Sequence, residues 1–265
     1  MKKIIKSIAA LLVLLVVLVF AVFVYIDTIA KTAIQSGAQY ALGVDVTLGS
    51  ADVGLLSGEF AMQDLKIANP DGFESPHFLH LENGNAQITL SSLSENTVVL
   101  PTLTLTGIDM HLEKKGDKSN YDVIFENLSR FNSEDKPQDE AEGKKFIIRE
   151  VLLKDIVVHV EVELLLSGET KLDLPIDEIR LENVGSDSDG GVLLSELTSV
   201  LMKQLMLEIV KRGGGLIPAD MLDELGQGLS QLDSIAEVGI DVVEGVGDVL
   251  KDVGKGIEDL FGGDK

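Results

Sequence analysis

The segment that decides the fold is Leu103–Thr104–Leu105–Thr106–Gly107–Ile108–Asp109–Met110, whose apolar residues are spaced by two, three and two positions. A regular strand alternates its side chains with a period of two, so the step of three either moves the later residues to the opposite face or is absorbed by a β-bulge. A bulge would keep all the apolar residues on one face and increase the local twist. The segment therefore predicts a strand with an irregular step at its centre.

The same spacing recurs in Phe60–Ile67 and Val151–Val158, and its first three positions recur in Ile179–Val184. Together with turn sequences such as Asn69–Gly72, these repeats predict a twisted, curved and mainly antiparallel sheet over residues 44–185. Its apolar face is interpreted either as an ordinary core covered by a sheet or helix, or as a partly open groove for acyl chains. The groove candidates are Phe60, Met62, Leu65, Ile67, Leu103, Leu105, Ile108, Met110, Val151, Leu153, Ile156, Val158, Ile179 and Leu181.

The N-terminal part of the chain predicts a membrane anchor. Residues 7–26 contain no charged side chain and, at about 1.5 Å per residue, are long enough to cross a bilayer core about 30 Å thick as a helix. Three lysines lie within residues 1–6, which are therefore expected in the cytoplasm, with the bulk of the chain exported. A cleaved signal peptide is the alternative, but its apolar core is usually shorter and ends at a better site than Thr28–Ala30. The helix is expected to continue over residues 27–43.

The regions outside the sheet differ in character. Residues 129–145 are polar and rich in charge, which predicts a mobile loop with little apolar area to offset the entropy of ordering. Residues 192–212 are apolar over much of a helical circumference and predict a buried helix. Residues 218–261 carry a heptad-like apolar stripe and predict a Gly-rich amphipathic helix at the C-terminal end of an α+β protein.

This last helix should form only when its stripe is packed, because each of its glycines costs about 1 kcal/mol relative to alanine. Its polar face is acidic, whereas a helix lying on a membrane surface is usually basic. Three roles are therefore open for residues 222–260: a lid on the apolar face of the sheet, self-association or binding of a partner protein, and membrane contact.

Composition excludes several classes of function. The formal charge of −22 at pH 7 argues against nucleic acid as a partner and against docking on anionic headgroups, because both need basic patches. The sequence contains no cysteine, which excludes a disulfide framework and thiol chemistry.

Catalytic and metal-binding patterns are weak. His77 and His80 lie near two glutamates, but they fall in a Pro-containing loop without a compelling third ligand, so we predict no metal site. The sequence has no nucleophile elbow, phosphate-binding loop or dinucleotide-binding turn, and we predict neither a cofactor nor catalysis. His111 and His159 alternate with apolar residues, which predicts that they point to the wetter face of their strands.

Several segments resemble the AsmA family. They are Gln39–Val46 after the predicted anchor, Gly58–Phe73 with its Asn-Pro-Asp-Gly-Phe turn, Leu103–Glu113, and a turn at Ser119–Asp122. The resemblance covers residues 1–130 and, more loosely, 146–185. It implies an inner-membrane protein of the Gram-negative envelope with a periplasmic β-groove, similar to bridge-like lipid-transfer proteins whose grooves carry phospholipid acyl chains.

Two functions are therefore expected. The first is a non-catalytic, inner-membrane-anchored periplasmic protein that binds or helps transfer phospholipid or another acyl-chain lipid through its groove. The chain is shorter than the larger members of the family, which favours holding lipid over bridging two membranes alone. The alternative is a structural or adaptor protein of the envelope, with a closed β core and a helical tail that binds a partner.

Overall fold

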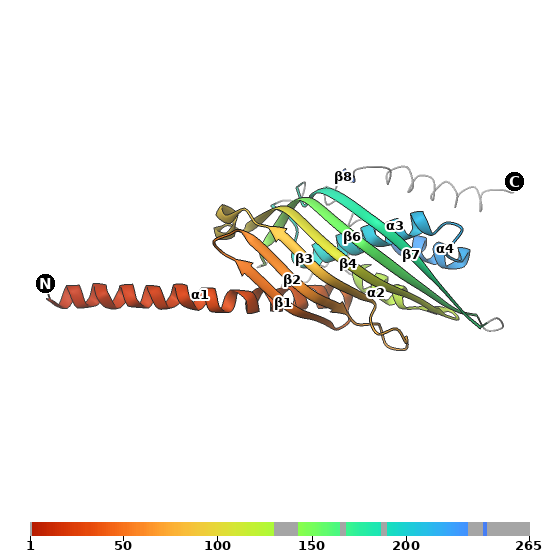
Figure 1. Cartoon of the computed structure of the whole chain (residues 1–265), viewed down its shortest axis with the longest axis horizontal. Helices are drawn as coiled ribbons and strands as arrows, with labels where there is room; N and C mark the ends of the chain where they lie inside the picture. The colour runs from red at the N-terminus through yellow and green to blue at the C-terminus, as the bar shows by residue number, and fades with distance from the viewer. Residues whose placement is uncertain (1, 130–142, 165–167, 187–189, 233–240, 243–265) are drawn as a thin grey trace.

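The computed structural model, which describes residues 2–129, 143–164, 168–186, 190–232 and 241–242, is built on one open, curved sheet (Figure 1). Neighbouring strands follow the order β1-β2-β3-β4-β6-β7-β8, and β5 pairs with β4. All pairs are antiparallel except β4 and β6. The strands are β1 (Val46–Gly54), β2 (Glu59–Ile67), β3 (Leu79–Gln87), β4 (Thr97–Lys115), β5 (Lys118–Ser119), β6 (Lys145–Leu164), β7 (Gly168–Val184) and β8 (Asp241–Val242).

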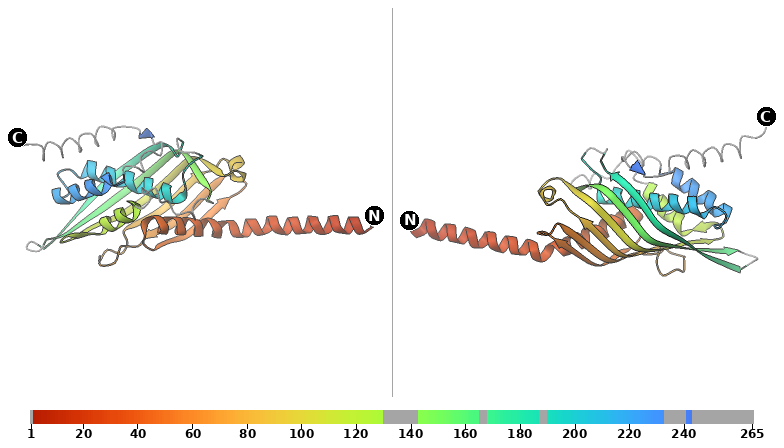
Figure 2. Two further views of the ribbon diagram at one scale, coloured as in Figure 1. Left: turned by 180° about the vertical axis from the view of Figure 1, so that it is seen from behind. Right: turned by 45° about the horizontal axis from the view of Figure 1, so that its top comes forward.

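The helices of the body lie on one face of this sheet (Figure 2). They are α2, α3 and α4, whereas α1 projects from one end of the body, and the short 3₁₀ helix η1 joins β3 to β4. Their bounds are α1 (Lys2–Leu42), η1 (Leu90–Ser94), α2 (Asn120–Ser129), α3 (Leu194–Gly213) and α4 (Ala219–Ser230). The sheet and its helices thus form two layers with the apolar core between them.

The step of three in the apolar spacing occurs at the same place in each of the six long strands. Pairing is interrupted there on both partner strands and then resumes in the same register, so neither strand carries an extra residue. The irregular step is therefore shared by all the strands and is not a bulge of one strand against its neighbour. The residues in this unpaired row are Gly49, Asp64, Glu82, Gly107, Asp155 and Asp177.

Positive φ angles at three members of the row, one each in β2, β4 and β6, explain how these three strands keep one apolar face. Asp64, Gly107 and Asp155 have φ angles of 58°, 74° and 52°. A left-handed residue rotates the chain so that the apolar residues before and after it point the same way. Glycine, aspartate and asparagine tolerate this conformation better than other residues do, which accounts for the residue types at these three positions.

Gly107 tests this explanation. We expect Gly107→Val to lower the free energy of unfolding by about 2 kcal/mol, since a β-branched residue is strained at φ 74° and its Cβ would lie 2.7 Å from Glu82 Oε2. Gly107→Asn is the matched control and should cost less than half as much, because asparagine tolerates the left-handed region. Equal losses in urea unfolding of the two variants would contradict the explanation.

The end of α1 is fixed to the edge strand β1 by a stripe of polar side chains four residues apart. Asp27 Oδ1 accepts a hydrogen bond of 2.8 Å from the Val53 amide. Further along the helix, Lys31 Nζ donates to Gly49 O at 2.9 Å, and Gln35 Nε2 donates to Val46 O at 3.2 Å. These bonds pair backbone groups that an edge strand would otherwise leave open.

The helix predicted for residues 27–43 agrees with α1, which ends at Leu42. Gly43 has a φ of 69° and its amide donates to Gln39 O at 2.8 Å, as in a glycine C-cap. Within the described part of the chain, we find no helix with the length and hydropathy of a membrane span. Most side chains of residues 7–26 lie outside that part, so the anchor stays a prediction.

Two other segments differ from the sequence prediction. Of residues 119–122, expected as a turn, Ser119 ends β5 and the other three begin helix α2, which packs its apolar side chains against the sheet. The helix predicted over residues 218–261 is observed as α4, but Asp241–Val242 form strand β8 on the open edge of β7. An edge strand offers unpaired backbone groups, and the glycines before residue 241 weaken the helical alternative.

Residues 130–142, 233–240 and 243–265, which carry the predicted loop and most of the tail, lie outside the described residues.

Candidate functional site

The apolar residues predicted to form a groove all point to the face of the sheet that the helices cover. All of them are buried except Phe60 and Leu65, which are partly buried. The structure thus brings the four sequence repeats together on one continuous surface, since β2, β4, β6 and β7 carry them in register. The expectation that the repeats share a face is confirmed.

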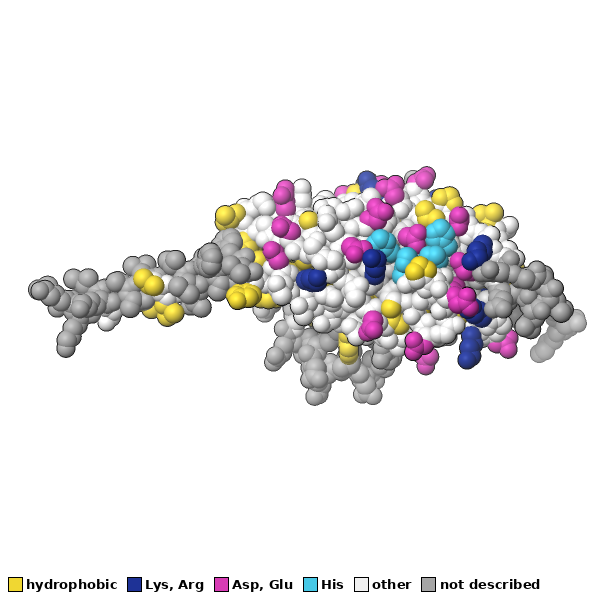
Figure 3. All heavy atoms as spheres, turned by 60° about the horizontal axis from the view of Figure 1, so that its bottom comes forward, with side chains coloured by type: hydrophobic (Ala, Val, Ile, Leu, Met, Phe, Trp, Pro, Cys, Tyr) yellow, Lys and Arg dark blue, Asp and Glu magenta, His cyan; other side chains and the backbone are white. Residues whose placement is uncertain are grey.

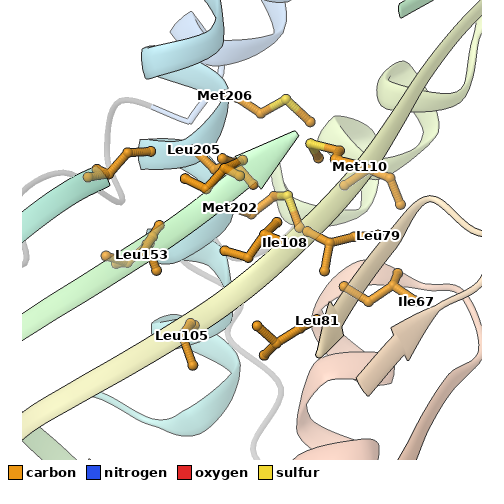
Figure 4. Close-up of a cluster of buried hydrophobic side chains, with 14 of the residues drawn as sticks. Ile67, Leu79, Leu81, Leu105, Ile108, Met110, Leu153, Met202, Leu205 and Met206 are labelled. Atoms are coloured by element: carbon orange, nitrogen blue, oxygen red, sulfur yellow. The ribbon is translucent and has the colours of Figure 1, made fainter. Parts of the chain in front are cut away.

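Helix α3 lies across the centre of this face. Figure 4 shows Met202, Leu205 and Met206 pointing from α3 toward side chains of the sheet that include Ile108 and Leu153. Met206 is fully buried. Methionine is unbranched and adapts to irregular surfaces, so these side chains fill the face without requiring a rigid fit. The predicted buried helix therefore acts as a cover for the predicted groove.

The apolar face is only partly covered at the end of the body from which α1 projects. Phe60 lies there, paired with Val53, whose amide binds Asp27 on α1. The adjoining β1–β2 turn and the start of η1 expose Leu56 (83%) and Leu90 (42%). Hydrophobic side chains are visible at this end of the body in Figure 3. This end, beside the predicted anchor, is an exposed apolar rim.

A buried carboxylate joins three of the segments that carry the family resemblance. Glu113, 2% exposed, accepts hydrogen bonds from Asn69 Nδ2 (2.5 Å) and from the amides of Glu74 (2.9 Å) and Ser75 (2.8 Å). The Asn120 side chain completes the cluster, because it donates to Asn69 Oδ1 at 3.0 Å and accepts from the Glu113 amide at 2.9 Å. The turn after β2 is thereby fixed to the end of β4 and the start of α2.

The ionised form of Glu113 suits this cluster. Burial by itself would raise the pKa of the carboxyl group, but the hydrogen bonds donated by the 69–75 loop outweigh it and hold the pKa below its ordinary value. The cluster therefore has a structural role, since every hydrogen bond that Glu113 accepts orders the loop.

A second polar cluster holds α4 beside the sheet. Lys114 Nζ lies 2.9 Å from Asp220 Oδ2 and 2.5 Å from Glu224 Oε1, and the Tyr121 hydroxyl donates to Glu224 Oε2 at 2.8 Å. Burial lowers the pKa of Lys114, but the two carboxylates outweigh it and raise the pKa above its ordinary value. These contacts link α4 to β4 and α2, and α4 in turn packs beside α3.

The sequence did not indicate every part of this surface. In β3, Leu79, Leu81, Gly84 and Ala86 repeat the two, three, two spacing and are buried on the same face. The small size of the last two residues hid the pattern, although the spacing itself could have revealed it. The particular residues of α3 that meet the sheet could not have been found from sequence spacing.

Comparison with protein-family models matches residues 1–184 to the model described as the AsmA family. The match runs from α1 to the end of β7, so α3 and α4 lie beyond it. Comparison with curated proteins finds no match.

Proposed function

Because the chain belongs to the AsmA family, which is associated with the bacterial envelope, we propose that it binds phospholipid or another acyl-chain lipid on the apolar face of its sheet. The proposal describes a non-catalytic protein held in the inner membrane by residues 7–26, with its N-terminus in the cytoplasm and its sheet in the periplasm. It binds lipid or helps to transfer it and requires no cofactor.

The observation that carries the proposal is the continuity of the apolar face. The buried inward-facing side chains of β1 to β4, β6 and β7 in the described residues are apolar, apart from Lys114 near the end of β4, which pairs with α4. A curved surface of this kind matches an extended acyl chain, which needs apolar contact along its length and no hydrogen bonds. The shared irregular step supports the proposal, because it preserves one apolar face along strands that would otherwise change faces.

Helix α3 is then a removable cover. It lies outside the part of the chain that matches the family, while the face beneath it lies inside that part. Its apolar side chains occupy the surface that acyl chains would need, so lipid binding requires α3 to move. Binding energy from the buried apolar area of the lipid would offset the loss of α3 contacts.

The exposed apolar rim gives lipid a route to the face. The contacts between α1 and β1 place the β1–β2 turn, with Leu56, next to Asp27, the first charged residue after the predicted anchor. A sheet fixed to the anchor in this way presents Phe60 and Leu56 toward the membrane surface, and lipid enters from that end.

Photo-crosslinking in native membranes tests the route and the face separately. We expect p-benzoylphenylalanine at Leu56 to give lipid adducts, since the rim lies at the membrane surface. The same residue at Phe60 replaces one aromatic ring by another on the partly buried face, and lipid adducts are expected there too. Leu216, 59% exposed on the loop between α3 and α4, is the control and should give none.

The adaptor function makes a different prediction in the same experiment. It is favoured by the burial of the face beneath α3, as in a closed core. It predicts that Phe60 gives adducts within the chain or with a partner protein, even if Leu56 reaches lipid. Absence of lipid at Phe60 together with lipid at Leu56 would contradict the groove and support the adaptor.

A further inference from the structure

All four histidines of the chain gather on the face of the sheet opposite the helices (Figure 3). Strand register explains the grouping, because His80 pairs with Asp109, and His111 pairs with His159. His77, in the loop before β3, completes the group: its ring centroid lies 5.0 Å from that of His111. The prediction that His111 and His159 point away from the apolar face is confirmed.

Two of these histidines, His77 and His111, converge on one carboxylate oxygen of Asp109. Asp109 Oδ1 lies 2.8 Å from His77 Nε2 and 3.2 Å from His111 Nε2. The three atoms all lie within 4.8 Å of one another. In a tetrahedral site with zinc–ligand bonds of about 2.0–2.1 Å, neighbouring ligand atoms are about 3.3 Å apart. Small rotations of these side chains would therefore bring all three atoms to bonding distance of one ion.

Outer groups are placed to orient this set. His159 Nε2 lies 3.0 Å from Asp109 Oδ2, and His159 Nδ1 lies 2.6 Å from Asp173 Oδ1. Glu161 Oε1 lies 3.9 Å from His111 Nδ1, on the side of the ring away from Asp109. Carboxylates behind ligating histidines commonly fix the tautomer and the ring orientation in metal sites.

His111 carries an unexplained feature of its own. Its side chain is 14% exposed, and its Nδ1 atom is buried without a hydrogen-bond partner. Buried polar atoms are nearly always paired, so such an atom calls for an explanation. With a metal on Nε2, the Nδ1 atom would carry the proton and face Glu161. Burial, which dominates over the neighbouring charges, lowers the pKa of His111 and favours the neutral imidazole that metals require.

We propose that His77, Asp109 and His111 form a binding site for a divalent transition-metal ion such as Zn²⁺. Two imidazoles and one carboxylate suit zinc, cobalt, nickel or copper, whereas calcium and magnesium prefer sets of oxygen ligands. The fourth position faces outward and would hold water or an exchangeable ligand. Because the site joins the loop before β3 to β4, a bound ion ties these segments together. It lies on the face opposite the proposed lipid surface and does not depend on it.

Metal titration of the full-length chain in detergent, without an added histidine tag and after removal of metals by a chelator, tests the site. We expect one Zn²⁺ per chain in competition with a chromophoric chelator, and cobalt absorption bands typical of four-coordination. His111→Gln and Asp109→Asn each remove a ligand and should lower the zinc affinity more than 100-fold. Glu161→Gln removes an outer group and should lower it 10–100-fold, as is usual for such groups. His80→Gln is the matched control, because His80 pairs with Asp64 outside the ligand set, and its affinity should equal that of the wild type.

Thermal unfolding gives a second readout that does not depend on the competitor. Zinc should raise the unfolding midpoint of the wild type and of His80→Gln, but not that of His111→Gln. Circular dichroism of the metal-free variants checks that they are folded. Absence of saturable binding by the wild type, or equal affinity of His111→Gln and wild type, would overturn the proposal and leave the cluster as a hydrogen-bonded histidine network.

Discussion

Met206→Asp should lower the free energy of unfolding by more than about 3 kcal/mol and detach α3 from the sheet. The residue is fully buried between α3 and the apolar face, and an unpaired charge at such a position is among the most destabilising single changes. The sheet itself keeps its apolar face in this variant. If that face binds lipid, the amount of phospholipid that copurifies with the chain should rise, as measured by mass spectrometry of the extracted lipid.

Leu153→Asp is the matched variant. It places the same charge on the sheet at a position that is also buried beneath α3, so it disrupts the cover and the face together. Its stability should fall by a similar amount, but its bound lipid should not rise. Leu216→Asp, at an exposed position of the loop between α3 and α4, controls for added charge and should change neither quantity. Equal lipid contents of the two buried variants, with the β-sheet signal retained in circular dichroism, would show that the face is simply a core.

Glu113→Gln is the second change with a large expected effect, about 3 kcal/mol of unfolding free energy. The amide nitrogen of glutamine would replace one acceptor oxygen and face donors of the 69–75 loop, leaving buried N–H groups without partners. The matched control is Glu150→Gln. Glu150 pairs with Arg180 at 2.7 Å at a partly exposed position, so its replacement should cost less than about 1 kcal/mol.

The pH dependence of the unfolding free energy tests whether Glu113 is ionised in the folded state. Its folded pKa lies below the ordinary value of 4.5, so its ionised form stabilises the folded state above that pH. This contribution is lost as the pH falls through the folded pKa. The unfolding free energy of the wild type should therefore decline more steeply below pH 4.5 than that of Glu113→Gln. Parallel pH profiles for the two proteins would show that Glu113 is not ionised in the cluster.

The apolar face of each strand and the position of its irregular step could be predicted from the sequence, because both depend on local spacing. Leu103–Met110 and its repeats show the step of three, and the aspartates and glycines inside that step are the residues that tolerate a positive φ. The sequence left open whether the step changes faces or is absorbed. The answer depends on neighbouring strands, because the pairing survives only if all of them take the step in the same row.

The candidate sites could be predicted from the sequence only in part. The groove candidates were identified from the sequence because apolar periodicity marks a strand face. The partners of Glu113 and the histidine cluster were not, because Asn69, Glu113 and Asn120 come from three separate elements. Likewise the sequence did not show that Asp109 and His111 lie beside His77, because the pairing of β3 with β4 brings them together.

The sequence by itself determined the apolar faces of the strands, the glycine that ends α1 and the acidic character of the chain, since each depends on residue type and short-range spacing. Tertiary structure alone decided what lies on the apolar face, namely α3, and which polar groups meet on the face behind it. Those outcomes depend on contacts between residues far apart in the chain, and short-range periodicity carries no information about which distant surfaces will meet.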